Sequence, residues 1–207
     1  IANHIRLVVD NAYEVALIET IATRLNKKAK MMFRIKPGIE AHTHEYIKTG
    51  HIDSKFGFEF NDILPLIKKI HGSEWGEFIG IHAHIGSQIF DMNPYYDLVS
   101  ILVGFMDTIY SEFGIDIPEL NCGGGFGIKY TENDQAPDIT DIILGMATEL
   151  KLLCDGKKRP RPKLVFEPGR SIIANAGVTI YTAGTSKPIS DGQQYLFIDG
   201  GMADNPR

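Results

Sequence analysis

The sequence predicts a parallel α/β fold. Short apolar runs that suit buried strands alternate with stretches in which apolar residues recur every three or four positions, as on one face of a helix. The chain carries this alternation through five strands, without an internal repeat or a low-complexity segment. Polar and glycine-rich motifs follow several of the runs directly. The pattern alone fits both a barrel and an open doubly wound sheet.

The expected strands are short and apolar. They cover residues 5–9, 31–35, 78–81, 117–120 and 164–166. Pro37 and Gly38 end the second strand, because proline lacks an N–H for the sheet ladder. His82 and His84 follow the third strand. Strict alternation along this strand predicts that His82 points to the side opposite His84.

Four helices are expected between these strands, each with one apolar stripe. The stripes are Tyr13, Leu17, Ile21 and Leu25 (flanked by Val15 and Ile18); Ile63, Leu66, Ile67 and Ile70; Leu98, Leu102, Phe105 and Ile109; and Ile139, Ile142, Ile143, Met146, Leu150 and Leu153. Asn61 or Asp62 is the expected cap of the second helix. Asn93 is the expected cap of the third, with Pro94 at its first position. Residues 36–60 are polar and non-periodic, which is typical of a functional loop.

The pattern changes after Ser171. Residues 178–182 and 195–198 are rich in β-branched and aromatic side chains, and glycines and a proline separate them. We therefore expect two domains. Residues 1–174 belong to the α/β part, and residues 175–207 begin an all-β domain.

The composition excludes several functions. The chain has 207 residues, of which 43% are hydrophobic, so it can bury a substantial core. A net charge of −5 argues against a nucleic-acid partner. No apolar run approaches the roughly 20 residues of a membrane span. Cys122 and Cys154 give neither a disulfide framework nor a metal-site spacing, so a reducing cytoplasm is expected.

Two motifs dominate the sequence, Asn-Cys-Gly-Gly-Gly-Phe-Gly at 121–127 and Phe-Glu-Pro-Gly-Arg at 166–170. Adjacent glycines let backbone N–H groups approach an anion closely. A Pro-Gly turn places an acid and an arginine on the same rim. The motifs suit a phosphorylated cofactor with a basic ring nitrogen, although two ordinary glycine-bearing turns are the alternative. The candidate residues are Gly123, Gly124, Gly125, Glu167, Pro168, Gly169 and Arg170.

Six segments together carry a resemblance to a known family. They are 34–38, 54–57, 84–88, 123–127, 167–170 and 199–207. With these segments the chain resembles the diaminopimelate decarboxylases, which belong to the pyridoxal-phosphate barrel class with the ornithine and arginine decarboxylases. The runs at 42–46 and 202–207 indicate the diaminopimelate branch. The resemblance implies the later strands of a (β/α)8 TIM-like barrel that binds pyridoxal 5'-phosphate, followed by the start of a β domain. It also implies decarboxylation of meso-2,6-diaminopimelate to L-lysine and CO2, the last step of lysine biosynthesis.

The resemblance also assigns roles to residues. Glu167 is similar to the catalytic carboxylate that faces the pyridine nitrogen, and His84 to the histidine that stacks on the cofactor ring. Ser87, the three glycines and Arg170 are similar to the phosphate contacts. Arg170 and Arg207 match arginines that bind a substrate carboxylate. Lys55 resembles a lysine that pairs with an acid of the second subunit, which implies a homodimer with shared active sites.

Two of the family's residues have no counterpart here. Its Schiff-base lysine lies in a Tyr-x-x-Lys-Ala-like motif that this chain lacks, and neither Lys36 nor Lys55 suits that role. Its catalytic cysteine is expected beyond Arg207. The chain therefore resembles an internal fragment, and we expect it to be inactive on its own.

Three other functions stay open on the sequence. Another basic amino acid, such as ornithine or arginine, can be the substrate. The paired histidines His42, His44, His82 and His84 suit a metal-dependent barrel hydrolase. The full-length barrel can also bind the cofactor or a partner decarboxylase without turnover.

Overall fold

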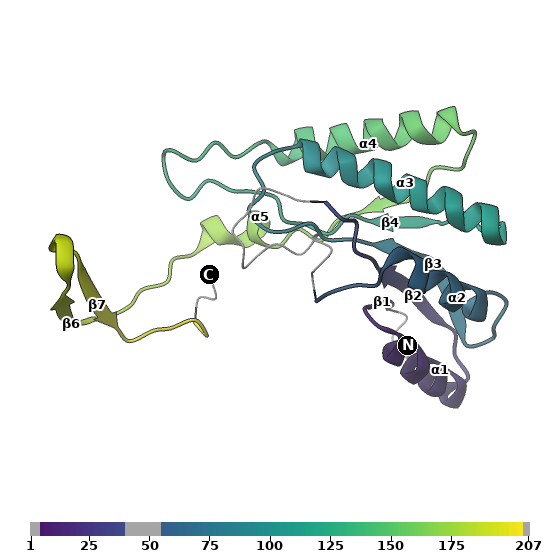
Figure 1. Ribbon diagram of the computed structural model, residues 1–207, viewed down its shortest axis with the longest axis horizontal. Coiled ribbons are helices and arrows are strands. Elements are labelled where there is room, and N and C mark those ends of the chain that lie inside the picture. The colour runs from purple at the N-terminus through teal and green to yellow at the C-terminus, as the bar shows by residue number, and fades with distance from the viewer. Residues whose placement is uncertain (1–4, 40–54, 205–207) are drawn as a thin grey trace. The chain divides into compact units, whose positions relative to one another are not determined.

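The computed structural model describes residues 5–39 and 55–204 of the chain (Figure 1). The chain divides into two compact units, Ile1–Ile172 and Ile173–Arg207. None of the helices in these described ranges is both long and apolar enough to cross a membrane.

The first unit alternates strands and helices, as the sequence predicts. In chain order its elements are β1 (Arg6–Val9), α1 (Ala12–Leu25), β2 (Ala29–Arg34), α2 (Phe60–Ile70), β3 (Gly76–His82), α3 (Asn93–Phe113), β4 (Glu119–Asn121), α4 (Ile139–Gly156) and β5 (Lys163–Val165). The short helix α5 (Arg170–Ile173) follows and was not expected from the sequence. Each expected strand of this unit overlaps an observed one, with bounds that differ by at most two residues.

The five strands form one parallel sheet in the order β1-β2-β3-β4-β5. An open doubly wound sheet reverses its strand order at a switch point, and this sheet does not. Sequential parallel strands with intervening helices are consecutive units of a (β/α)8 barrel, so the barrel alternative is the correct one. In such a fold the carboxyl ends of all the strands meet at one rim.

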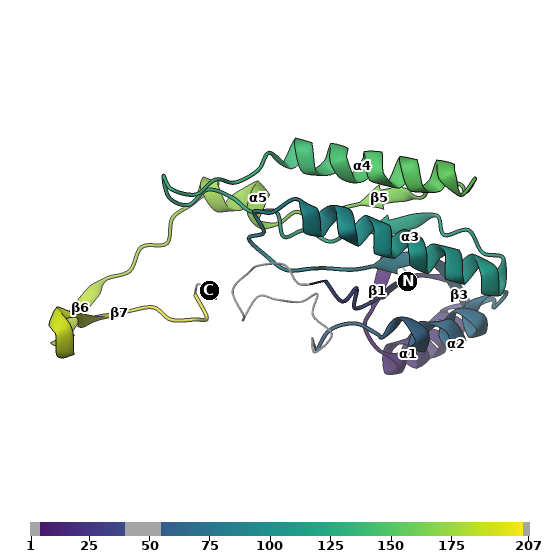
Figure 2. The ribbon, with the colours of Figure 1, turned by 45° about the horizontal axis from the view of Figure 1, so that its top comes forward.

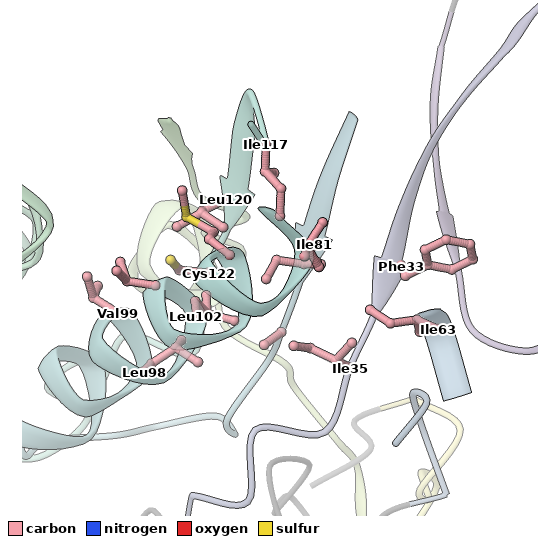
Figure 3. Packing of buried hydrophobic residues seen from close by; sticks show 14 of the residues in the cluster. Phe33, Ile35, Ile63, Ile81, Leu98, Val99, Leu102, Ile117, Leu120 and Cys122 are labelled. Atoms are coloured by element: carbon pink, nitrogen blue, oxygen red, sulfur yellow. The ribbon is translucent and has the colours of Figure 1, made fainter. Parts of the chain in front are cut away.

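The helices of the first unit lie along its sheet (Figure 2). Among the described residues, the buried apolar side chains of these helices and strands form one cluster. Leu98 and Leu102 of α3 pack in this cluster with Ile81 of β3 and Leu120 of β4, and all four are fully buried (Figure 3). Helix α3 contacts both α2 and α4, so these helices form one layer. Burying side chains of this size stabilises the fold by about 1.5–3 kcal/mol each.

Helix α1 departs from its predicted stripe. Tyr13, Leu17 and Leu25 are 77%, 46% and 41% exposed, whereas Val15 and Ala22 are buried. In α1 these three large side chains therefore do not face the core, whereas Val15 and Ala22 do. The sequence pattern placed Val15 only at the flank of the stripe and did not include Ala22.

Two predicted helix caps are wrong by a few residues. Helix α2 begins at Phe60 with Glu59 as its cap, rather than at Asn61 or Asp62. Helix α3 begins at Asn93, and Met92 is its cap. The Oδ1 atom of Asp91 accepts the N–H of Asn93 at 2.9 Å, so an acid two residues upstream satisfies this free backbone donor.

The second unit contains an antiparallel pair of strands, β6 (Ala183–Pro188) and β7 (Gln194–Ile198). The 3₁₀ turn η2 (Ala174–Ala176) precedes the strands, and the 3₁₀ turn η3 (Ser190–Gly192) connects them. The prediction for β7 is confirmed. The strand expected at 178–182 is wrong, because β6 begins at Ala183.

Candidate functional site

Three polar residues end neighbouring strands of the sheet and lie in one row. Arg34 ends β2, His82 ends β3 and Asn121 ends β4. In the register of the sheet, Arg34 pairs with His82 and His82 pairs with Asn121. Asn121 in turn pairs with Val165, two residues before Glu167. The parallel register therefore gathers these side chains at the carboxyl rim, where barrel enzymes place their chemistry.

The carboxylate of Glu167 is held on two sides. Asn121 donates from Nδ2 to Oε1 of Glu167 at 2.8 Å, and Nε2 of His82 lies 3.4 Å from Oε2. The backbone N–H of Glu167 donates to the carbonyl of Gly123 at 2.7 Å. The Glu167 side chain nevertheless stays 50% exposed. It is an anchored carboxylate with a face open to a ligand.

Both histidines lie near this carboxylate. His82 contacts Glu167, and Nδ1 of His84 accepts the N–H of Gly124 at 3.3 Å. The predicted opposite orientation of His82 is therefore wrong, because alternation places residues two apart, such as His82 and His84, on the same side of an extended chain. Burial, and next to it the charge of Arg34, lower the pKa of His84 from 6.5 to about 4. Burial also lowers the pKa of His82. Both imidazoles are thus neutral near pH 7.

The glycine triplet packs against the backbone of its neighbours. A Cβ on Gly124 would lie 2.3 Å from the carbonyl oxygen of Glu167, and one on Gly125 would lie 2.2 Å from that of Gly86. Gly123 and Gly125 also have φ angles of 66° and 87°, which favour glycine. Close packing against neighbouring backbone thus accounts for glycine at these positions, whether or not a ligand binds there. The prediction that Gly124 and Glu167 share one rim is confirmed.

A pocket of about 180 Å³ opens beside Glu167. Its lining residues are His84, Ser87, Gly125, Phe126, Glu167, Gly169, Arg170 and Ser171. Arg170 donates from Nε to Oγ of Ser87 at 3.3 Å and from a terminal nitrogen to the hydroxyl of Tyr130. The turn after β5 therefore brings an arginine and an acid to one pocket, as the sequence predicts.

A family profile described as "Pyridoxal-dependent decarboxylase, pyridoxal binding domain" matches residues 2–174. The chain belongs to the pyridoxal-dependent decarboxylase family. A diaminopimelate decarboxylase of Synechocystis is 44% identical over 207 residues, which are all of this chain and 44% of that protein. The diaminopimelate decarboxylase of Bacillus subtilis is 38% identical over 203 residues, covering 97% of this chain and 46% of its own length. The chain thus spans less than half the length of these curated relatives.

Solved structures show the same fold. The diaminopimelate decarboxylase of Helicobacter pylori, complexed with L-lysine, matches with a TM-score of 0.78 at 32% identity over 96% of this chain and 47% of that chain. A lysine/ornithine decarboxylase of Vibrio vulnificus matches with a TM-score of 0.68 at 21% identity, over 95% of this chain and 46% of that chain. The second likeness supports the decarboxylase fold alone.

The pocket fits the phosphorylated ring that this family binds. Ser171 Oγ is buried there without a hydrogen-bond partner in the described part of the chain, so it is ready to meet a ligand oxygen. Gly125 lines the same pocket, and its N–H has no acceptor among the described residues. By contrast, Gly123 already donates to Oδ1 of Asn121 at 3.0 Å and Gly124 to His84. Of the three predicted glycines, Gly125 is thus the one whose N–H suits a phosphate oxygen.

Several predicted residues lie elsewhere. Lys55 lines a second pocket of about 570 Å³ with Asp10 and Lys36, and Lys36 pairs with Glu59 at 3.1 Å. His42, His44, the 42–46 motif and Arg207 lie outside the described residues. Cys122 is buried, and burial raises its pKa to about 12, so its thiol is unreactive near neutral pH. This agrees with the prediction that the family's catalytic cysteine is a different residue.

Sequence reasoning missed three polar residues of this site. Asn121 was quoted only as the start of the glycine motif, although its amide bridges that loop and Glu167. Its signal was a polar residue at the end of an apolar strand. Tyr130 and Ser171 were not considered, because a hydroxyl in a loop or after a turn has no pattern of its own.

Proposed function

We propose that the full-length protein decarboxylates meso-2,6-diaminopimelate to L-lysine and CO2 with pyridoxal 5'-phosphate as its cofactor. The observation that carries this proposal is the Glu167 carboxylate, anchored by Asn121 and His82 and open toward a pocket that contains Arg170. An anchored acid beside an anion pocket matches a ring with a basic nitrogen at one end and a phosphate at the other. The relatives named above support the choice of diaminopimelate.

Different residues would contact the phosphate and the ring of the cofactor. Arg170, Ser87, Ser171 and the N–H of Gly125 would hold the phosphate, since a guanidinium and neutral donors suit an oxyanion. Glu167 would keep the pyridine nitrogen protonated. The bound cofactor supplies an electron sink for the pair released when the bond to CO2 breaks.

His84 would lie against the cofactor ring as a neutral imidazole. It lines the pocket, and the N–H of Gly124 holds its Nδ1 atom. A neutral ring adds no positive charge next to the pyridine nitrogen that Glu167 must keep protonated. We place His84 with Glu167 in the catalytic set for this reason.

Substrate recognition needs a cation for the second carboxylate of diaminopimelate. We assign Arg170 and Arg207 to this contact. Ornithine and arginine lack that carboxylate, so a site built around it leaves an arginine without its partner when either of them binds. The purified full-length protein with its cofactor is expected to form L-lysine and CO2 from meso-diaminopimelate at least about 100-fold more efficiently than it turns over ornithine or arginine.

Equal turnover of ornithine would overturn the substrate assignment and favour the alternative decarboxylase. The metal-hydrolase alternative makes a different prediction, namely loss of activity with a chelator. Within residues 5–39 and 55–204, no three His, Cys, Asp or Glu side chains come together as a metal site. His82 and His84 are instead engaged with Glu167 and Gly124.

Assembly and organisation complete the proposal. We assign residues 1–174 to the cofactor-binding barrel and residues 175–207 to the opening of a C-terminal β domain. We also assign a homodimer with shared active sites, with Lys55 near the interface, and a cytoplasmic location, with which two free buried cysteines agree. Sedimentation of the full-length protein as an active monomer would contradict the dimer.

A further inference from the structure

The two oxygens of Glu167 have different partners, and both come from neighbouring strand ends. Asn121 on β4 donates to Oε1, and His82 on β3 lies beside Oε2. Asn121 is 3% and His82 4% exposed, while Glu167 is half exposed. The Glu167 carboxylate is thus partly exposed, while the two side chains that contact it are buried.

Asn121 also determines how the glycine loop lies against this carboxylate. Its Oδ1 accepts the N–H of Gly123 at 3.0 Å while its Nδ2 donates to Glu167. The side-chain amide therefore has one orientation that satisfies both partners. An aspartate of the same shape keeps the Gly123 contact but turns the donor into a second negative charge.

The surroundings of His82 determine its protonation. Its Nδ1 is buried and has no partner within the described residues. A proton there would leave a buried donor unpaired, which costs about 1–3 kcal/mol. The remaining neutral tautomer carries its proton on Nε2, toward Glu167. Burial is the largest influence on the pKa of His82 and lowers it. Of the charged groups near the ring, Glu167 favours a second proton, Arg34 from β2 opposes it, and Asp10 after β1 favours it least.

We propose that Asn121 and the neutral, Nε2-protonated His82 are positioning residues, which hold the Glu167 carboxylate aimed at the cofactor's ring nitrogen. This inference rests on the proposed function of Glu167. Two donated hydrogen bonds favour the charged form of a carboxylate over the neutral form. A protonated His82 would instead draw the charge of Glu167 toward itself and away from the ring.

The first experiment uses the full-length holoenzyme with Asn121→Asp. We expect kcat to fall at least about tenfold, because a like charge now faces Glu167. The KM for the substrate should change much less than kcat, because the changed residue acts on Glu167 rather than on the substrate contacts. The dissociation constant of the cofactor should stay within about twofold, because the phosphate contacts are unchanged.

The same substitution in a Glu167→Gln background tests whether Asn121 acts through Glu167. With the carboxylate already absent, Asn121→Asp should lower kcat by less than about twofold more. A purely structural role would lower the thermal midpoint and cofactor affinity in both backgrounds.

The second experiment concerns His82. His82→Gln keeps a donor near Glu167, and His82→Phe removes it at similar volume. We expect the glutamine variant to retain kcat within about threefold, and the phenylalanine variant to lose at least about tenfold. In the full-length protein without cofactor, the ¹⁵N-histidine NMR spectrum should show His82 as the neutral Nε2–H tautomer at pH 7.

The outcomes distinguish the positioning role of Asn121 and His82 from the proposed function of Glu167. If Glu167→Gln loses kcat while Asn121→Asp and His82→Phe keep it, the positioning role is wrong and the proposed function stands. If Glu167→Gln itself keeps full kcat, the assignment of Glu167 fails and the positioning role fails with it. A His82 that is protonated at pH 7 overturns the part of the inference that concerns His82.

Discussion

At the scale of single residues, the proposed site divides into ring contacts and phosphate contacts. Glu167 contacts Asn121 and His82, whereas Arg170 contacts Ser87 and Tyr130. These two sets of contacts share no residue, although Glu167 and Arg170 line one pocket. Substitutions at Glu167 and Arg170 should therefore have separable effects.

Glu167→Gln in the full-length enzyme should lower kcat by at least about tenfold, equivalent to roughly 1.4 kcal/mol of transition-state stabilisation. Glutamine keeps the shape of the side chain but cannot hold the ring nitrogen protonated. The cofactor should still bind, as its absorbance after gel filtration will report. Full kcat in this variant would contradict the role of Glu167.

Arg170→Ala is the matched comparison. Loss of the guanidinium should weaken cofactor binding at least about tenfold and raise KM, because a charge-assisted contact contributes about 1.5–3 kcal/mol. Equilibrium dialysis of the cofactor measures the effect directly. If Arg170→Ala and Glu167→Gln lose the cofactor equally, the assigned division is wrong.

His84 should make stability depend on pH. Its pKa is lowered from 6.5 to about 4 in the folded protein, so between these values the unfolded chain binds more protons than the folded chain. Stability is therefore lost as pH falls from about 6.5 toward 4. The free energy of unfolding of full-length His84→Gln, measured with urea at pH 7 and pH 5, should change less between these two values than that of the wild type. An equal change in both proteins would contradict the lowered pKa.

The sequence identified the residues of this site that belong to a motif. Glu167, Arg170, Ser87 and His84 come to one pocket as predicted. Asn121 escaped notice because its role depends on the register between β4 and its neighbours, which single-strand patterns do not contain. His82 was misplaced because alternation was misapplied: residues two positions apart, such as His82 and His84, point to the same side of an extended chain.

At the scale of elements, two helical glycines should respond oppositely to the same change. Gly104 of α3 is exposed, and a Cβ there would have no neighbour within 4 Å in the described structure. Gly145 of α4 faces α3, and a Cβ there would lie 2.4 Å from Cε1 of Tyr96. The local space, rather than helix propensity alone, therefore decides the effect of alanine.

Gly104→Ala should stabilise the full-length protein by about 0.5–1 kcal/mol through helix propensity. Gly145→Ala should destabilise it by about 1–3 kcal/mol, since the Tyr96 ring must move. Thermal or urea unfolding of both variants provides the measurement. A stabilised Gly145→Ala would show that α3 and α4 do not pack as described.

Periodicity located the buried faces of α2, α3 and α4 because their large aliphatic residues recur on one side. Ile63, Ile67 and Ile70 of α2 are all at most 1% exposed. It failed for α1, where the larger apolar side chains face outward and a small alanine faces in. Periodicity ranks positions by the hydrophobicity of their side chains. Close packing of a helix against a sheet also depends on the size of those side chains.

The misplaced strand of the second unit has a related cause. Residues 178–182 were chosen for their β-branched and aromatic content, but the turn determines which residues pair. Asp191 and Gly192 have φ angles of 67° and 76°, and Ile189 N–H donates to the carbonyl of Gln193 at 2.9 Å. An Asp-Gly turn of this kind puts Pro188 opposite Gln194 and Ala183 opposite Ile198. The Asp-Gly dipeptide therefore predicts the positions of the strands better than the β-branched and aromatic content of residues 178–182 does.

At the scale of the whole molecule, the two units differ in how much apolar surface they bury. The first has a continuous core with many fully buried side chains. In the second, Tyr195, Leu196, Phe197 and Ile198 of β7 are 45–61% exposed, although they alternate between the two faces of the strand. A two-stranded sheet on its own is marginally stable in water, because it has too little surface to bury.

A peptide of residues 177–202 should therefore lack a cooperative transition when it is heated and followed by circular dichroism. Its amides should exchange with solvent at nearly unprotected rates, whereas residues 183–198 of the full-length protein should be protected wherever further strands or helices cover β7. The exposed run on β7 is the reason, because each of its apolar side chains would gain about 25 cal/mol per Å² on being covered. A peptide that melts cooperatively and protects its amides would show that the Asp191–Gly192 turn and the cross-strand pairs suffice to fold this unit.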